Sequence, residues 1–131
     1  MNTDNLTEKA QQIIMEAVNT ATAMQHSMIT PHHIMKALMN TNDLDIILNE
    51  NEVTKNAVLA IANEALEGMA KVEGAQLKVN QAFTSMMQEA ARWAQSHGDT
   101  FVSIFALFLA IIKSESRYEN LLPYKKIEES I

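Results

Sequence analysis

Apolar side chains recur at three- and four-residue steps along most of the chain, which is the period of one buried face of an α-helix. The pattern predicts helices over residues 8–24, 31–39, 44–48, 55–67, 81–97 and 104–112. Five of them begin after a side chain that can accept hydrogen bonds from the free amides of the first turn. These expected N-caps are Thr7, Thr30, Thr54, Asn80 and Ser103. Residues 117–122 carry a weaker helical pattern that Pro123 interrupts.

One arrangement, a long helix followed by a turn and a short helix, occurs twice. Shifting the first copy by 73 positions places Thr30 on Ser103 and Ile34 on Leu107 without a gap. Apolar class and capping side chains coincide over about 34 positions, as in an internal repeat. We therefore expect two units that bury their apolar faces against each other about a pseudo-twofold axis. Between them, residues 68–79 lose periodicity and include Gly74, which predicts a loop.

Composition supports one helical domain spanning residues 1–131. The chain has 47% hydrophobic residues, three glycines and two prolines, which suits helices around a single core. Its formal net charge of −6 disfavours binding to nucleic acid or to anionic membrane surfaces. The N-terminus carries no export signal, and residues 101–112 are too few to span a membrane, so we expect a cytoplasmic protein.

Catalytic motifs are absent from the sequence. The three glycines do not have the spacing of a phosphate-binding loop, and no cysteine is available as a nucleophile or a zinc ligand. His32 and His33 are adjacent, so on a helix they point about 100° apart and chelate poorly. We therefore expect a protein that is not an enzyme and needs no cofactor or metal, while catalysis by His32 or His33 remains a minor alternative.

Nine methionines allow two interpretations. Most of them lie on or beside apolar stripes, which is typical of core positions. Flexible, polarisable side chains also suit a surface that binds varied apolar ligands. The sequence favours the core and leaves open that some methionines line a groove.

Several segments resemble the Clp amino-terminal domain. Residues 6–10 (LTEKA) and 26–38 (HSMITPHHIMKAL) are similar to its first repeat, and residues 98–112 (GDTFVSIFALFLAII) are similar to its second. Residues 71–77 resemble the inter-repeat loop of ClpB-type disaggregases. The resemblance covers residues 3–122, with repeats at about 6–68 and 79–122, and it implies an all-α, compact bundle of about eight helices.

The resemblance also implies substrate-binding residues. The threonine at the first helix start matches Thr7, and the aspartate after the glycine that ends the second long helix matches Asp99. Asn80 replaces the hydroxyl residue that usually opens that helix. The chain departs from the family at Phe105, where an acidic residue is usual, and at Ala106. We expect a partly exposed Phe105 and a more apolar binding surface.

The function implied by the family is non-catalytic capture of unfolded or aggregated protein for translocation by separate AAA+ ATPase modules. One alternative is an adaptor-docking domain of a ClpA- or ClpC-type unfoldase. Another is a stand-alone regulatory relative without ATPase modules.

Overall fold

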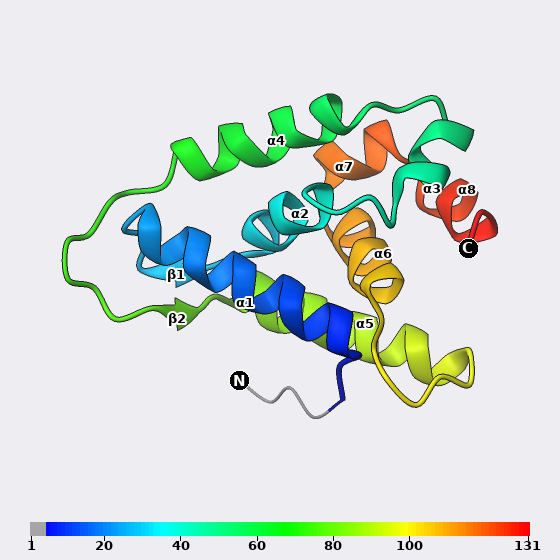
Figure 1. Cartoon of the computed structure of the whole chain (residues 1–131), viewed down its shortest axis with the longest axis horizontal. Helices are drawn as coiled ribbons and strands as arrows, with labels where there is room; N and C mark the ends of the chain where they lie inside the picture. Colours follow the sequence, from blue (N-terminus) through cyan, green and yellow to red (C-terminus); the bar gives the residue numbers. More distant parts are fainter. Residues whose placement is uncertain (1–4) are drawn as a thin grey trace.

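The computed structural model describes residues 5–131 and forms eight helices and two short strands over that range (Figure 1). The expected bundle of about eight helices is confirmed. The elements in chain order are α1 (Glu8–Ala23), β1 (Met28–Ile29), α2 (Pro31–Met39), α3 (Asp45–Glu50), α4 (Lys55–Glu67), β2 (Lys78–Val79), α5 (Gln81–Ser96), α6 (Ile104–Ser114), α7 (Ser116–Leu121) and α8 (Tyr124–Glu129).

Four of the five expected side-chain caps form as the sequence predicts. Thr7, Thr54, Asn80 and Ser103 each accept a hydrogen bond from the backbone N–H three residues later. At Thr30 the arrangement differs, because its own backbone N–H donates to the ring nitrogen Nδ1 of His33, 2.9 Å away. His33 thereby takes the place that glutamate or glutamine holds in a capping box.

Residues 6–39 and 79–112 correspond position by position. Both ends of α5 lie 73 residues after the matching ends of α1 (81 − 8 and 96 − 23). Strand β1 pairs in parallel with β2 through Ile29 and Val79, and an isolated parallel bridge joins Leu6 to Val102. These two pairs exchange under the same 73-residue shift, so the segment that leads into each long helix pairs with the other half. This exchange is the pseudo-twofold relation expected from the sequence.

Helix α6 forms the centre of the core. All residues from Ala106 to Ile112 are buried, and α6 packs against α1, α2, α5, α7 and α8. In Figure 1 it lies in the middle of the bundle, with α4 and α7 above it and α1 and α5 below. An all-round apolar helix of eleven residues is therefore an interior element, as the sequence predicted.

The short strands were not predicted, because two residues carry no alternating pattern. Helix α8 lies in a tail whose sequence was too short to interpret, and its buried Ile127 holds it against the bundle. None of the helices in residues 5–131 is both long and apolar enough to cross a membrane.

Candidate functional site

A hollow of about 420 Å³ lies where the N-terminal ends of α1 and α6 meet. Its lining residues are Thr7, Lys9, Asp43, Ser103, Ile104 and Phe105, and we call it the α6 hollow. The two helix ends meet because the Thr7 N–H donates to the carbonyl of Val102 at 2.9 Å, beside the Leu6–Val102 bridge. The exchanged pairing of the two halves thus builds this hollow.

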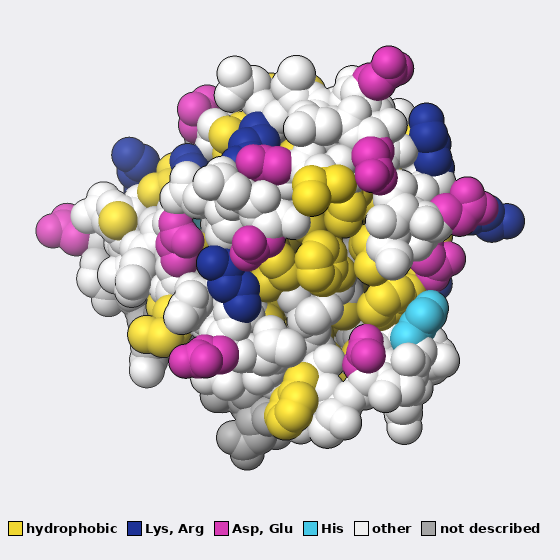
Figure 2. All heavy atoms as spheres, turned by 45° about the vertical axis from the view of Figure 1, so that its right-hand side comes forward, with side chains coloured by type: hydrophobic (Ala, Val, Ile, Leu, Met, Phe, Trp, Pro, Cys, Tyr) yellow, Lys and Arg dark blue, Asp and Glu magenta, His cyan; other side chains and the backbone are white. Residues whose placement is uncertain are grey.

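Phe105 supplies the main apolar surface of the α6 hollow. Its ring packs against the core from a half-buried position, as expected from the sequence. On the rim, Lys9 Nζ and Asp43 Oδ2 lie 3.4 Å apart, with about half of each side chain exposed (49% and 45%). Such an exposed ion pair contributes at most about 1 kcal/mol to the free energy of unfolding, so its two side chains separate easily. The face that carries the N-terminal end of α6 gathers apolar side chains at its centre, with charged ones around them (Figure 2).

Thr7 has a structural role beside its place in the hollow, since its Oγ1 accepts from the Ala10 N–H at 3.1 Å. Replacing Thr7 with alanine is expected to lower the free energy of unfolding by about 1 kcal/mol through the lost cap. Thr7→Ser keeps the hydroxyl and should lie within about 0.5 kcal/mol of the wild type. Urea titrations of both variants measure this difference, and equal destabilisation by serine would contradict the capping role.

The other three residues expected to bind substrate do not line the α6 hollow. Asp99 lines a separate hollow of about 350 Å³ with Asn5 and Val102. Asn80 lines a third hollow on another face. The side chain of Ala106 is fully buried, and its N–H donates to the Ser103 cap, so it offers a ligand no surface. Asn80 is the counterpart of Thr7 under the 73-residue shift, and the pseudo-twofold axis separates these two positions.

The third hollow, about 580 Å³ in volume, is the counterpart of the α6 hollow. We call it the α2 hollow; its lining residues are Thr30, Pro31, His32, Ala65, Met69, Asn80, Ala82, Ser85, Ser114, Glu115 and Arg117. A shift of 73 residues carries five of the six residues that line the α6 hollow onto residues of this set. His32 occupies the position of Phe105. The two hollows are therefore formed by equivalent backbone segments that carry different side chains.

Side chains of the α2 hollow are held by a polar network. His32 Nδ1 lies 2.8 Å from the Tyr118 hydroxyl, and Arg117 Nε donates to Glu115 at 3.2 Å. Burial, together with the nearby Arg117 charge, lowers the pKa of His32 below its usual value. Burial alone would raise the pKa of Glu115, but its hydrogen bonds from Arg117 outweigh burial and lower it. Burial raises the pKa of Tyr118, so its hydroxyl stays neutral.

A buried histidine pair, which includes the residue after His32 of the α2 hollow, was missed from the sequence. His26 Nδ1 and His33 Nε2 lie 2.8 Å apart, and both residues are buried. Burial, together with the neighbouring His26, lowers the pKa of His33 to about 4. Seven residues separate the two in sequence, across a helix end and a turn, so periodicity gave no signal of their contact.

Metal ligands do not converge on these hollows. Over the range 5–131, histidine, aspartate and glutamate side chains form no group of three able to hold a metal ion. What the hollows offer a ligand is apolar surface with a few hydrogen-bonding groups at the rim. Concave apolar surface with a few polar groups is the usual composition of a ligand-binding site.

Two helical halves that exchange their leading segments and enclose paired hollows define a double-repeat α-helical domain. The family model described as the Clp repeat (R) N-terminal domain matches residues 5–123, and the chain belongs to this family. A chaperone protein ClpB from Bacteroides thetaiotaomicron is 27% identical over 124 residues, which are 93% of this chain and 14% of that protein. A ClpB from Prochlorococcus marinus is 25% identical over 134 residues and is matched over 16% of its length. The chain thus spans a small part of these relatives.

Solved structures show the same fold at low sequence identity. The Hsp104 N-terminal domain from Candida albicans superposes with a TM-score of 0.82 at 16% identity, covering 96% of this chain and 88% of that one. The N-terminal domain of the ClpV1 ATPase from E. coli gives 0.81 at 16% identity, covering 95% and 82%. A ClpV N-domain in complex with a VipB peptide gives 0.70 at 18% identity, covering 95% and 76%.

Proposed function

We propose that the chain is a non-catalytic module that captures exposed apolar segments of unfolded or aggregated protein at the α6 hollow. Separate AAA+ ATPase modules of a ClpB-type disaggregase would then translocate the captured polypeptide. In this proposal residues 1–131 act as one domain, with repeats at 6–68 and 79–122 joined by the loop 68–79.

The observation that carries the proposal is the half-buried Phe105 ring in an otherwise open hollow. An aromatic side chain supplies a large, rigid contact area for the apolar side chains that denatured proteins expose. Hydrogen-bonding groups at the rim, including the Thr7 hydroxyl, suit an extended backbone without selecting one sequence. The ClpB relatives and the peptide-bound ClpV N-domain support a polypeptide as the ligand.

Charge at the centre of the α6 hollow is expected to weaken capture. Phe105→Glu should weaken binding of a reduced and alkylated, permanently unfolded protein at least about tenfold, because the bound apolar segment would have to desolvate a carboxylate. Fluorescence anisotropy with the labelled unfolded protein measures the dissociation constant. Phe105→Leu keeps apolar surface and should bind within about threefold of the wild type.

Phe101→Glu is the matched control for charge, because Phe101 is 49% exposed and lies outside the lining of the hollow. It should leave capture unchanged, as should Asn80→Ala and Asp99→Ala, whose side chains line other hollows. Circular dichroism confirms that each variant is folded. Equal binding by Phe105→Glu and the wild type would overturn the assignment of the α6 hollow.

A second candidate function is docking of one folded adaptor or one specific peptide. The ClpV N-domain that binds a VipB peptide has this fold, which favours the alternative. Competition separates the two functions: a surface for captured clients should be blocked by several unrelated unfolded proteins, whereas a dedicated docking surface should ignore them.

A further inference from the structure

The connector between α1 and α2, residues 24–29, holds the inter-repeat loop in place. Three alternate carbonyls of the connector accept hydrogen bonds from the loop and from the residue after β2. The bonds run from Val72 to Gln25 (2.8 Å), from Lys78 to Ser27 (3.0 Å) and from Asn80 to Ile29 (3.3 Å). Because these bonds share one short segment, the loop stays in place only while the connector does.

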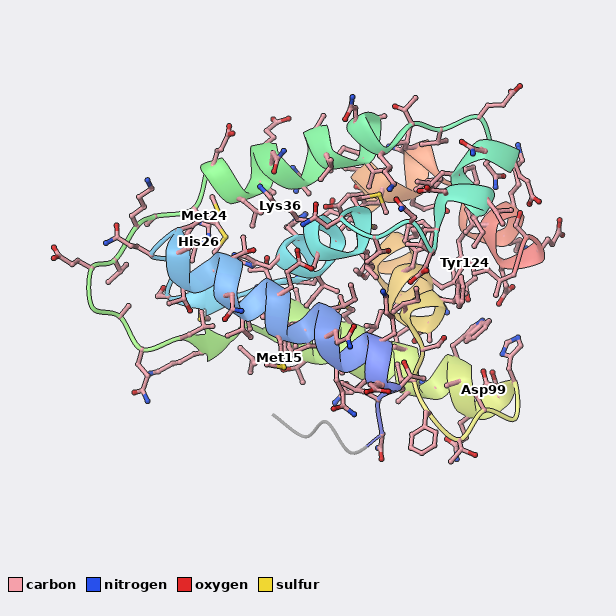
Figure 3. All side chains as sticks on the ribbon, in the orientation of Figure 1. Met15, Met24, His26, Lys36, Asp99 and Tyr124 are labelled. Carbon is pink, nitrogen blue, oxygen red and sulfur yellow. The ribbon has the colours of Figure 1, made fainter. Side chains whose placement is uncertain are left out.

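His26 fastens this connector to α2. It lies between the two carbonyls that hold Val72 and Lys78, and its ring points inward to His33 at the start of α2. The label in Figure 3 places His26 at the end of α1, beside the loop. The contact between the two rings is therefore the link between the helix bundle and the loop.

The hydrogen bonds of the pair fix the proton positions. The Thr30 N–H donates to His33 Nδ1, so this nitrogen is an acceptor and the proton of the neutral ring lies on Nε2. His33 Nε2–H then donates to His26 Nδ1, which leaves the His26 proton on its own Nε2. That Nε2 is buried with no hydrogen-bond partner among the described residues.

This arrangement disfavours another proton. A proton on His33 Nδ1 would face the Thr30 N–H, with the Thr30 Oγ1 at 3.0 Å as an acceptor, and a proton on His26 Nδ1 would face the His33 N–H. The charged or titratable groups that act on the pair from outside are Lys71 of the loop and Lys36 and His32 of α2. From α4 only the Leu66 carbonyl favours a proton on His26. A cationic ring would thus be repelled by both lysines, while the backbone groups of Leu66 and Thr30 favour the proton on His26 and His33, respectively.

We propose that the His26–His33 pair is an acid-sensitive latch: proton uptake by either ring detaches the connector from α2 and releases the inter-repeat loop. Residues 68–79 then open while the rest of the bundle stays folded. The lowered pKa values of both rings agree with this direction, since burial opposes their charged forms. The opened rings are in water, where they take up protons near the ordinary histidine pKa.

The second half of the chain provides an internal control. Asp99 and Ala106 occupy the positions 73 residues after His26 and His33, so no titratable pair forms there. Asp99 is exposed at the far end of α5 from the latch (Figure 3). The Leu6–Val102 pairing, which is the counterpart of β1 and β2, should therefore hold under acid conditions that open the loop.

Amide hydrogen exchange followed by NMR tests the latch on the unmodified chain. Between pH 7 and pH 5, protection factors corrected for intrinsic rates should fall at least about tenfold at Val72, Lys78 and Asn80, because open rings bind protons more tightly. The amides of Thr7 and Val102, bonded across the other pairing, should change less than about threefold. An equal loss of amide protection at the loop and at the Leu6–Val102 pairing would overturn the proposal, and so would unchanged protection at the loop.

The matched variant is His33→Gln, which places a standard capping-box residue after Thr30 and cannot titrate. Its loop protection should fall much less with pH than that of the wild type, because only His26 of the pair can still take up a proton. An acid-induced loss as large as in the wild type would count against the latch. If His33→Gln does not fold, NMR of the histidine ring nitrogens in the wild type tests the latch by reporting the protonation state of each ring. It should show both rings neutral with the proton on Nε2 at pH 6, and a charged ring at that pH would refute the latch.

Discussion

Replacing Phe108 with alanine is expected to lower the free energy of unfolding by about 3–5 kcal/mol. Phe108 is fully buried in α6, the helix that packs against five others, so its removal leaves a cavity that the rigid surroundings fill only in part. Because total stability of a domain this size is about 5–15 kcal/mol, the variant should be partly unfolded near body temperature. Urea-induced unfolding monitored by circular dichroism measures the loss.

Phe101→Ala is the control for the same chemical change at a half-exposed position outside the buried core cluster. Its effect should stay below about 1 kcal/mol. A comparable loss in the two variants would mean that α6 is not the centre of the core. Any defect of Phe108→Ala in polypeptide capture should disappear when binding is expressed per folded molecule, because its side chain does not line the α6 hollow.

Lowering the pH from 7 to 4 is expected to remove about 3 kcal/mol of stability through His33 alone. Burial and the neighbouring His26 lower its pKa from 6.5 to about 4 in the folded chain. The stabilisation is complete above pH 6.5, and it falls as the pH drops toward 4, since in that range the proton binds only to states in which the ring is exposed to water. The lowered pKa values of His26 and His32 act in the same direction.

Urea midpoints measured at half-unit intervals between pH 7.5 and 4 check this expectation. The His33→Gln variant should show a distinctly flatter decline, because the group with the largest proton linkage is gone. A midpoint that stays constant between pH 6.5 and 5 in the wild type would show that His33 is not held neutral by the fold.

The sequence was sufficient for the helices because each carries its own periodicity and cap. The ends predicted from Thr7, Thr54, Asn80 and Ser103 agree with the structure, and the 73-residue shift revealed the pseudo-twofold relation. Phe105 was found as a departure from the family pattern, and its half-buried position is as expected.

The grouping of site residues was not predictable, because it depends on where the symmetry axis passes. Residues at equivalent points of two repeats resemble one another in sequence, yet an axis between them places them apart, as with Thr7 and Asn80. The histidine contact was missed for a related reason. His26 belongs to a turn with Gln25 in a left-handed conformation (φ 60°), and that geometry has no sequence periodicity.

The exchange of leading segments makes this chain an intramolecular dimer. Residues before α1 pair beyond α5, and residues before α5 pair beyond α1, so neither half can close its own backbone bonds. A half made alone would present one unpaired strand edge and the site that receives it, and two such copies are self-complementary. Because the two halves belong to one chain, their association is intramolecular rather than bimolecular. The sequences of the two halves can then diverge from each other. One half contributes the aromatic surface of Phe105, and the other contributes the His26–His33 latch.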